Sequence, residues 1–154
     1  MSDPQNLVDR TLFTFVLNHE IHRATRLQYP VSLLCLTPDL TRGAVNPFLL
    51  SRLARQAVSQ LRATDLVTKL DGQKVALLLA DAETRNLPVI LKRVKEGLDL
   101  ISPEKQPSKM SLTLSAGGSC YPQTASNAGE LLRQAVKLTG RAKAEGGNRL
   151  CLPP

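Results

Sequence analysis

The feature that most constrains the fold is the stretch LRATDLVTKLDGQKVALLLA at residues 61–80. Two β-prone runs, residues 65–70 and 73–79, flank an Asp71-Gly72 dipeptide, which is the strongest short-range signal for a β-hairpin. Both runs are apolar enough to be central strands, so the turn is expected at an exposed end of a buried sheet. Because loops at such ends often carry function, this turn is a candidate functional element.

Helical and strand patterns surround the hairpin on both sides. Apolar residues recur at intervals of three and four over residues 3–27, over residues 48–61, after Pro88 and up to residue 144, which predicts four amphipathic helices. The last helix is expected to start at a Ser126 or Asn127 cap and to stop at Gly146-Gly147. Apolar runs at residues 31–36 and 110–122 predict two buried strands, and residues 148–152 predict an edge strand. The order αβαββαβαβ suits a mixed sheet with helices packed against it.

Length and composition indicate a single folded domain that spans residues 1–154. The chain has 154 residues, of which 42% are hydrophobic and 21% charged, enough to bury one core. No apolar run approaches the roughly 20 residues that span a bilayer, and the N-terminus lacks a signal-peptide pattern. The chain has three cysteines, an odd number without CxxC spacing, which fits a reducing compartment. We therefore expect a cytoplasmic protein without membrane insertion.

The net charge of +7 favours an anionic partner without identifying it. A nucleotide, a nucleic acid or an acidic protein would each fit, and a well-solvated basic surface is the commonest explanation of such a count. Aromatic residues make up only 3% of the chain and Trp is absent, which argues against base stacking of single-stranded nucleic acid. Nucleic-acid binding also lacks a motif here, so we rank it last.

Two other motifs do not carry the chemistry that they suggest at first sight. His19 and His22 lie in an HEIH sequence, which lacks the HExxH spacing that places two imidazoles one helical turn apart with a Glu between them. Gly117-Gly118 lacks the GxxxxGK[ST] pattern of a phosphate-binding P-loop. Neither motif predicts a metal or phosphate site, and we expect no metal and no cofactor.

The order Arg-x-x-Asp, strand, tight turn and strand resembles the GGDEF domain of diguanylate cyclases, whose signature lies on that hairpin turn. Similar segments occur at residues 7–36, 111–122, 130–136 and 142–150. The resemblance implies an α/β (α+β) nucleotide-cyclase palm with a central, mixed, mostly antiparallel five-stranded sheet flanked by helices. The N-terminal helix would cover residues 3–27 and the core residues 30–152. The five signature positions read Asp71, Gly72, Gln73, Lys74 and Val75, so one position of the five is kept.

Several departures from the family concern catalysis. In the cyclases the first strand ends in Asp-x-Asp, and the first Asp binds the Mg²⁺ that bridges the GTP triphosphate; here these positions read Thr37, Pro38 and Asp39. Gln73 and Lys74 replace the signature carboxylates, and Mg²⁺ sites depend on one or two carboxylates plus phosphate. The resemblance, with these replacements, implies no cyclase activity.

Departures also affect substrate binding. Between Asp39 and Arg62 the chain is shorter than the family spacing, and the missing stretch is the one that holds the guanine of the substrate in the family. Asn46 is better explained as a helix cap than as a remnant of that stretch. Near the C-terminus Lys143 is kept, while a phosphate-facing Arg becomes Gly147. Whether Lys74 and Lys143 let GTP bind the old cleft is left open.

A second family site is kept. Many cyclases have an inhibitory site, the I-site, whose Arg-x-x-Asp motif ends five residues before the signature, and Arg62 and Asp65 reproduce that spacing. A secondary Arg on the following helix aligns with Arg93. Guanine offers O6 and N7 to a guanidinium, and its N1–H and amino group to a carboxylate. The alternative is structural: a basic residue favours a helix C-terminus and an Asp caps a turn, without any ligand.

Two functions follow from the resemblance. In the first, the chain is an inactive GGDEF-like domain that binds cyclic di-GMP at Arg62, Asp65 and Arg93 as a receptor and regulates an unidentified protein partner. In the second, it is a scaffold for dimerisation or protein docking with a vestigial nucleotide site. The long N-terminal helix favours the scaffold, since in the family it often continues a signalling or dimer helix.

Overall fold

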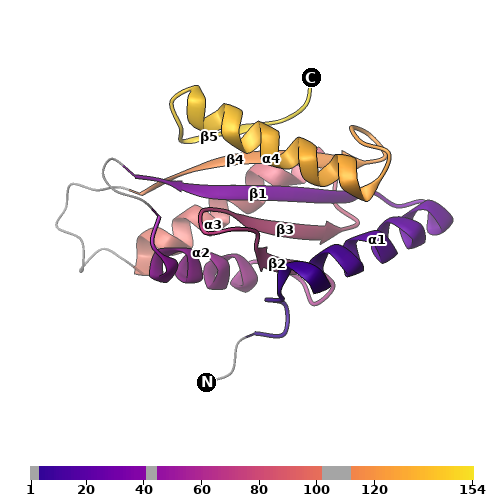
Figure 1. Ribbon diagram of the computed structural model, residues 1–154, viewed down its shortest axis with the longest axis horizontal. Helices are drawn as coiled ribbons and strands as arrows, with labels where there is room; N and C mark the ends of the chain where they lie inside the picture. The colour runs from indigo at the N-terminus through magenta and orange to yellow at the C-terminus, as the bar shows by residue number, and fades with distance from the viewer. Residues whose placement is uncertain (1–3, 41–44, 102–111) are drawn as a thin grey trace.

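The computed structural model describes residues 4–40, 45–101 and 112–154, with the side chains of residues 99–101 left out. The described residues form four α-helices, five strands and one short 3₁₀ helix (Figure 1). In chain order these are α1 (Arg10–Leu27), β1 (Val31–Asp39), α2 (Pro47–Ser59), β2 (Leu66–Lys69), β3 (Val75–Ala80), η1 (Thr84–Asn86), α3 (Leu87–Ile101), β4 (Thr113–Tyr121), α4 (Ala128–Ala144) and β5 (Arg149–Cys151). The order αβαββαβαβ is confirmed. Residue 3 of the predicted first helix and residues 110–111 of the predicted strand lie outside the described part.

The strands form one mixed sheet in the order β2-β3-β1-β4-β5. β1 lies at the centre and pairs antiparallel with both β3 and β4, β2 pairs antiparallel with β3, and β5 alone runs parallel to its neighbour, β4. The prediction of a mixed, mostly antiparallel sheet of five strands is therefore confirmed.

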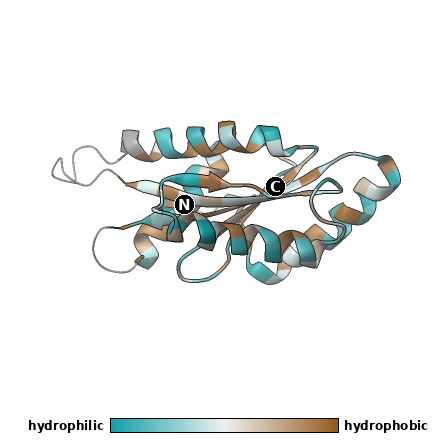
Figure 2. Ribbon diagram, turned by 90° about the horizontal axis from the view of Figure 1, so that it is seen from above, coloured by the Kyte–Doolittle hydropathy of each residue, from teal (hydrophilic) through white to brown (hydrophobic). Residues whose placement is uncertain are grey.

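Helices cover both faces of this sheet (Figure 2). Leu34 and Leu36 of β1 belong to the core cluster with α2 and α3, while Leu33 and Cys35 belong to the cluster with α1 and α4. Successive side chains of a strand point to opposite faces, so a strand covered on both sides is expected to be apolar at most positions. This explains the continuous apolar runs in β1 and β3.

Gly117 allows α4 to lie directly on β4. A Cβ atom at this position would lie 2.3 Å from the carbonyl oxygen of Ala135 and 2.3 Å from the backbone nitrogen of Thr139. Both atoms belong to the α4 backbone, which has no freedom to move away. The glycine therefore serves close helix-to-sheet packing rather than phosphate binding.

The hairpin is confirmed, but two details of its prediction are wrong. β2 is an edge strand, not a central one. The turn is also not a two-residue Asp-Gly turn, because the Leu70 N–H donates to the Lys74 carbonyl at 2.9 Å and leaves residues 71–73 as the connection. The Asp71 carboxylate accepts hydrogen bonds from the backbone N–H groups of Gln73 and Lys74 at 2.7 and 2.9 Å, which shapes the turn without a positive φ at Gly72.

The first helix starts at Arg10 instead of residue 3. The Asp9 side chain caps α1 by accepting a hydrogen bond from the Leu12 N–H at 2.8 Å. The preceding residues run along the open edge of β2: the Val8 N–H donates to the Val67 carbonyl at 2.9 Å, and the Val67 N–H donates to the Asn6 carbonyl at 2.8 Å. Backbone pairing with the edge strand therefore replaces the predicted helical turns, and it covers an edge that would otherwise be open.

The other helix boundaries follow the predicted signals. The Asn46 side chain accepts a hydrogen bond from the Leu49 N–H at 2.8 Å, so this residue caps α2, as the simpler interpretation predicted. Asn127 caps α4 in the same way. Gly146 and Gly147 follow α4 with positive φ values of 119° and 75°, which are conformations that glycine adopts most readily.

Candidate functional site

Arg62 and Asp65 lie in the turn between α2 and β2, where they are bonded to each other. The Asp65 Oδ2 accepts hydrogen bonds from the backbone N–H and the Nε–H of Arg62 at 3.1 and 3.4 Å. Its Oδ1 accepts one from the Ala80 N–H at 3.1 Å, and the residue is only 2% exposed. The carboxylate therefore ties the turn to the end of β3, as the structural alternative for this motif expects.

Asn6 also forms hydrogen bonds with the turn that carries Arg62 and Asp65. Its Nδ2 donates to the Asp65 carbonyl at 2.7 Å and to the Arg62 carbonyl at 3.1 Å. The sequence analysis missed this residue, because it lies far from the turn in the chain and carries no motif. The N-terminal segment therefore takes part in fixing the Arg-x-x-Asp backbone.

The Arg62 side chain is anchored and exposed at the same time. Its Nη2 donates to the Ala80 carbonyl, and its Nε contacts Asp65, yet 58% of the side chain remains exposed. Arg93 on α3 is also exposed, and it lines the same cavity of about 330 Å³ as Arg62 and Asp65. The structure thus brings the three predicted residues around one cavity.

The cavity also includes residues that the sequence analysis did not select. Asp81 and Ala82 follow β3, while Asn86 ends η1 and Val89 lies in the first turn of α3. Asn86 uses its Oδ1 to accept a hydrogen bond from the Glu83 N–H at 2.8 Å, which leaves its amide N–H groups as donors. For Asp81 and Ala82 the local signal was their place just after a buried strand, and for Asn86 and Val89 it was the helix start around Pro88.

A second cavity, of about 250 Å³, lies beside the signature turn and is lined by Thr37, Gln73, Lys74 and Lys143, among others. The Thr37 hydroxyl donates to the Gln73 carbonyl at 2.8 Å and joins the turn to β1. Lys74 Nζ lies 3.3 Å from Asp71 Oδ2, and Lys143 Nζ donates to the Pro38 carbonyl at 3.0 Å. The cavity is therefore lined by two cationic side chains.

The pKa of the Asp71 carboxyl is lowered. Partial burial raises it, but the Gln73 N–H hydrogen bond and the charge and hydrogen bonds of Lys74 outweigh the burial. The anionic form is favoured, which keeps the ion pair with Lys74 intact. Part of the positive charge beside the signature turn is neutralised in this way.

Asp39 braces the end of β1 instead of facing this cavity. Its carboxylate accepts hydrogen bonds from Thr113 Oγ1 at 2.7 Å, Ser115 Oγ at 2.6 Å and the Asn148 N–H at 2.8 Å. Partial burial raises its pKa, but these three bonds and the charge of Lys143 outweigh the burial and lower the pKa below its ordinary value. A Cβ at Gly147 would lie 2.9 Å from this carboxylate, so the loop before β5 packs directly on Asp39.

The described ranges also bear on metal binding, membrane crossing and cysteine chemistry. Within the described ranges, no three His, Cys, Asp or Glu side chains come together as a metal-ligand set. In the same part of the chain, no helix is both long enough and apolar enough to cross a bilayer. The three cysteines are free thiols, and burial raises the pKa of Cys35 to about 11.

Comparison with known proteins gives a family match and structural matches. A family model described as diguanylate cyclase, GGDEF domain, matches residues 47–149. No curated protein matches the chain. Among solved structures, the GGDEF domain of YfiN (TpbB) from Pseudomonas aeruginosa is 23% identical with a TM-score of 0.81, and the match covers 96% of this chain and 97% of that one.

Two further structures were determined as complexes. The GGDEF domain of DgcB from Caulobacter crescentus, in complex with c-di-GMP, is 17% identical with a TM-score of 0.71, covering 98% of this chain and 92% of that one. The diguanylate cyclase SiaD from Pseudomonas aeruginosa, in complex with its activator SiaC, is 21% identical with a TM-score of 0.80, covering 98% of this chain and 61% of that one. At these identities the matches establish the fold.

Proposed function

This chain belongs to the GGDEF domain family of diguanylate cyclases, and we propose that within it the chain is a catalytically inactive receptor. In this proposal it binds cyclic di-GMP at a site built by Arg62, Asp65 and Arg93 and passes the signal to a protein partner. It needs no metal and no cofactor. It acts in the cytoplasm, where its three thiols stay reduced.

The observation that carries the proposal is the cavity that Arg62 and Arg93 line from different elements. A guanidinium forms bidentate hydrogen bonds with guanine O6 and N7, stacks on base planes and neutralises phosphate. The bonds of Arg62 to Asp65 and Ala80 fix its position before any ligand arrives, which reduces the entropy lost on binding. The DgcB GGDEF domain, which has the same fold, was crystallised with c-di-GMP.

The proposal of inactivity rests on the side chains beside the signature turn. By the resemblance, Thr37 and Gln73 stand at positions where the cyclases hold metal-binding carboxylates, and Lys74 brings a cation in their place. Phosphoryl transfer of this kind needs Mg²⁺ to offset charge on the triphosphate, and these side chains favour no divalent cation. Because catalytic groups act as a unit, the loss of several leaves little activity.

Isothermal titration calorimetry with cyclic di-GMP tests the receptor function. We expect the wild type to bind and Arg62→Ala to lose binding, with thermal unfolding used to verify that the variant is folded. Arg23→Ala is the matched control, since its side chain is 69% exposed on α1 and outside the cavity. Absence of heat with the wild type would refute the receptor, and cyclic di-GMP formed from GTP with Mg²⁺ or Mn²⁺ would refute the inactivity.

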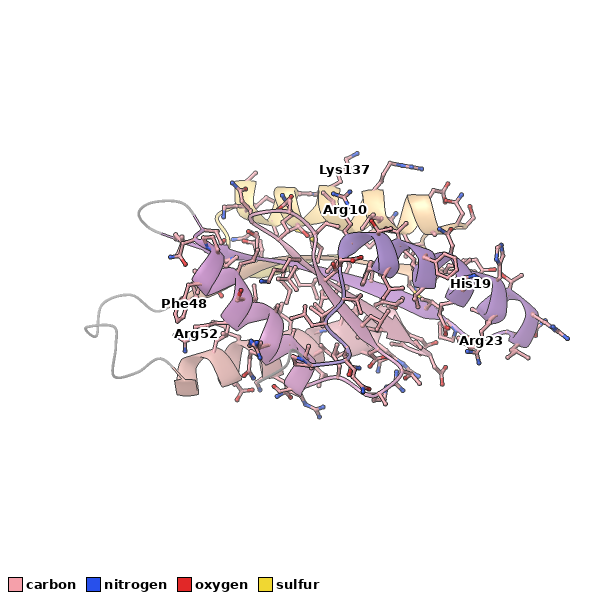
Figure 3. All side chains as sticks on the ribbon, turned by 60° about the horizontal axis from the view of Figure 1, so that its bottom comes forward. Arg10, His19, Arg23, Phe48, Arg52 and Lys137 are labelled. Atoms are coloured by element: carbon pink, nitrogen blue, oxygen red, sulfur yellow. The ribbon has the colours of Figure 1, made fainter. Side chains whose placement is uncertain are left out.

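The scaffold function stays as a second candidate because α1 exposes large apolar side chains. Leu12, Phe15 and Leu27 are 46%, 60% and 62% exposed, although the opposite face of α1 is buried against the sheet and α4. His19 and Arg23 project from the same helix into solvent (Figure 3). A homodimer, or a partner captured equally with and without cyclic di-GMP, would favour this function. Loss of the complex in Phe15→Ser would place it on α1.

A further inference from the structure

A third cavity, of about 600 Å³, lies where the C-terminal end of α1 meets the end of β4 and the loop that follows it. These two chain segments lie at the same end of the molecule in Figure 1. Its walls include Tyr29 and Tyr121, which are the two tyrosines of the chain. The volume is typical of small-molecule sites, so the lining side chains decide which kind of ligand would fit.

The charge of its lining residues separates this cavity from the two described above. Two arginines line the cavity at the Arg-x-x-Asp turn, and two lysines line the one beside the signature turn. None of the described residues that line the third cavity is Lys, Arg or His, although the chain has 20 Lys and Arg. Among them Glu83 carries a charge, and its carboxylate pairs with Arg85 at 2.6 Å. The cavity therefore presents no lining side chain that would neutralise an anion.

The hydroxyl hydrogens of both tyrosines are already used within the protein. The Tyr29 hydroxyl donates to the Glu20 carboxylate at 2.6 Å, since an ionised carboxylate can only accept. The Thr25 hydroxyl donates its one hydrogen to the Ile21 carbonyl at 2.8 Å, so Tyr121 is the donor in its bond with Thr25. Each phenol oxygen keeps lone pairs but has no hydrogen left to give. Toward a ligand, both tyrosine hydroxyls can therefore only accept.

The surroundings of Tyr29 also favour positive charge in a ligand. Burial raises the pKa of Tyr29 to about 12, helped by the hydrogen bond and charge of Glu20 and by Asp81, against a smaller opposing effect of Arg23. The end of α1 adds partial negative charge, because the last carbonyls of a helix lack helical partners. Arg26, the basic residue of that last turn, is exposed and does not line the cavity.

We propose that this cavity binds an organic cation, namely a primary ammonium ion on a short apolar stem. An ammonium group has three donors and no acceptor, which matches two tyrosine oxygens that can only accept. Ala24, Pro30 and Pro122 supply apolar surface for the stem. The third cavity and the cavity at Arg62 share no described lining residue, so this inference does not rest on the proposed function.

Tyrosine fluorescence reports on this cavity alone, because both tyrosines line it and the chain has no Trp. The probes are hexylammonium chloride, hexan-1-ol and sodium hexanoate, which share an alkyl chain and differ in the charge of the head group. At constant ionic strength we expect hexylammonium to change the emission saturably, and hexan-1-ol to bind at least about tenfold more weakly because it lacks the charge. Hexanoate is expected not to bind. Calorimetry with hexylammonium detects any binding that leaves the emission unchanged.

Two variants test whether the tyrosine oxygens hold the ammonium group. Tyr121→Phe removes one acceptor, and we expect about tenfold weaker hexylammonium binding, measured from the emission of Tyr29. Glu20→Gln removes the charge next to the Tyr29 hydroxyl and is expected to weaken binding by a smaller factor. Glu96→Gln is the charge-matched control, because this residue is exposed on α3 and does not line the cavity, and it should bind as the wild type does. Thermal unfolding verifies that each variant is folded.

Three results would overturn the inference. The first is equal or tighter binding of hexan-1-ol or hexanoate by the wild type, which would make the cavity a site for neutral or anionic ligands. The second is no binding of hexylammonium by either measurement. The third is wild-type affinity in folded Tyr121→Phe, which would place the ammonium group away from the tyrosine oxygens. The comparison of probes uses the wild type, so it decides the question even where Tyr121→Phe fails to fold, and it leaves the binding of cyclic di-GMP as a separate matter.

Discussion

The cavity beside the signature turn and the cavity at Arg62 lie at opposite ends of the sheet. They differ in the partners that hold their positively charged side chains. β1 pairs with β3 so that Leu36 faces Val75 near the signature turn, and Val31 faces Ala80 near the Arg62 cavity. Beside the signature turn, Lys74 is held by Asp71 and Lys143 by a backbone carbonyl. At the other end, Arg62 is anchored through part of its guanidinium and stays 58% exposed.

This difference shows that the positively charged side chains at the two ends of the sheet are used in different ways. Lys74 pairs with Asp71 and Lys143 donates to the Pro38 carbonyl, so each ammonium group already has one of its three donors engaged. An arginine has five donors in a fixed plane, so it can use some of them for anchoring and present the rest to an anion. We therefore expect the Arg62 end to be the better site for an anionic ligand, although both ends are basic.

The largest effect on stability is expected at Asp65. Asp65→Ala removes an acceptor of three hydrogen bonds and leaves the buried Ala80 N–H without its partner, which we expect to cost about 3 kcal/mol of unfolding free energy. Chemical denaturation measures this loss. Asp71→Ala at the other end is the comparison, because this carboxylate is exposed and water can replace it, so about 1 kcal/mol is expected. Equal losses at the two ends would contradict the buried, committed role of Asp65.

The next largest effect is expected at Gly147, near the signature turn. Gly147→Ala places a Cβ 2.9 Å from the Asp39 carboxylate on a backbone with φ of 75°, and we expect a loss of about 2 kcal/mol. Gly140→Ala is the matched control, because nothing lies within 4 Å of its Cβ position in α4. That variant should be more stable than the wild type by roughly 0.5–1 kcal/mol, through helix propensity. A neutral Gly147→Ala would show that the loop is free to move away from Asp39.

A smaller effect, a change of about tenfold in affinity, should distinguish which of the two cavities binds cyclic di-GMP. Arg93→Ala should weaken cyclic di-GMP binding by about tenfold or more, since it removes a charge-assisted contact. Lys143→Ala, at the other end, should change the affinity by less than about twofold. Calorimetry at constant salt measures both variants. The reverse pattern would move the site to the signature turn.

Much of the fold could be predicted because its signals are local. The hairpin, the Asn46 and Asn127 caps and the Gly146-Gly147 stop depend on residues within a few positions of one another. The start of α1 was predicted wrongly, because residues 6–8 pair with Val67 on the edge of β2, a contact that no periodicity reveals.

The candidate site could be predicted only in outline, for the same reason. Arg62, Asp65 and Arg93 were chosen by spacing and resemblance, and they do line one cavity. The sequence could not show that Asp65 is buried with both oxygens bound, nor that Asp81 is exposed beside it. Those facts depend on how β3 ends against the α2–β2 turn, which is a tertiary contact.

The smallest effect concerns the loss of unfolding free energy in acid, to which Asp39 contributes. Partial burial opposes ionisation of this carboxyl, but hydrogen bonds from Ser115, Thr113 and the Asn148 N–H, together with Lys143, lower its pKa in the folded state. A lowered pKa contributes stability above the unfolded value of 3.8, and this contribution is lost as the pH falls through the folded value. Wild type and Asp39→Asn should therefore differ most in unfolding free energy above about pH 5 and converge in stronger acid. Urea unfolding at a series of pH values measures the difference, and a gap that widens on acidification would mean that Asp39 is not the charged brace between β1 and the loop before β5.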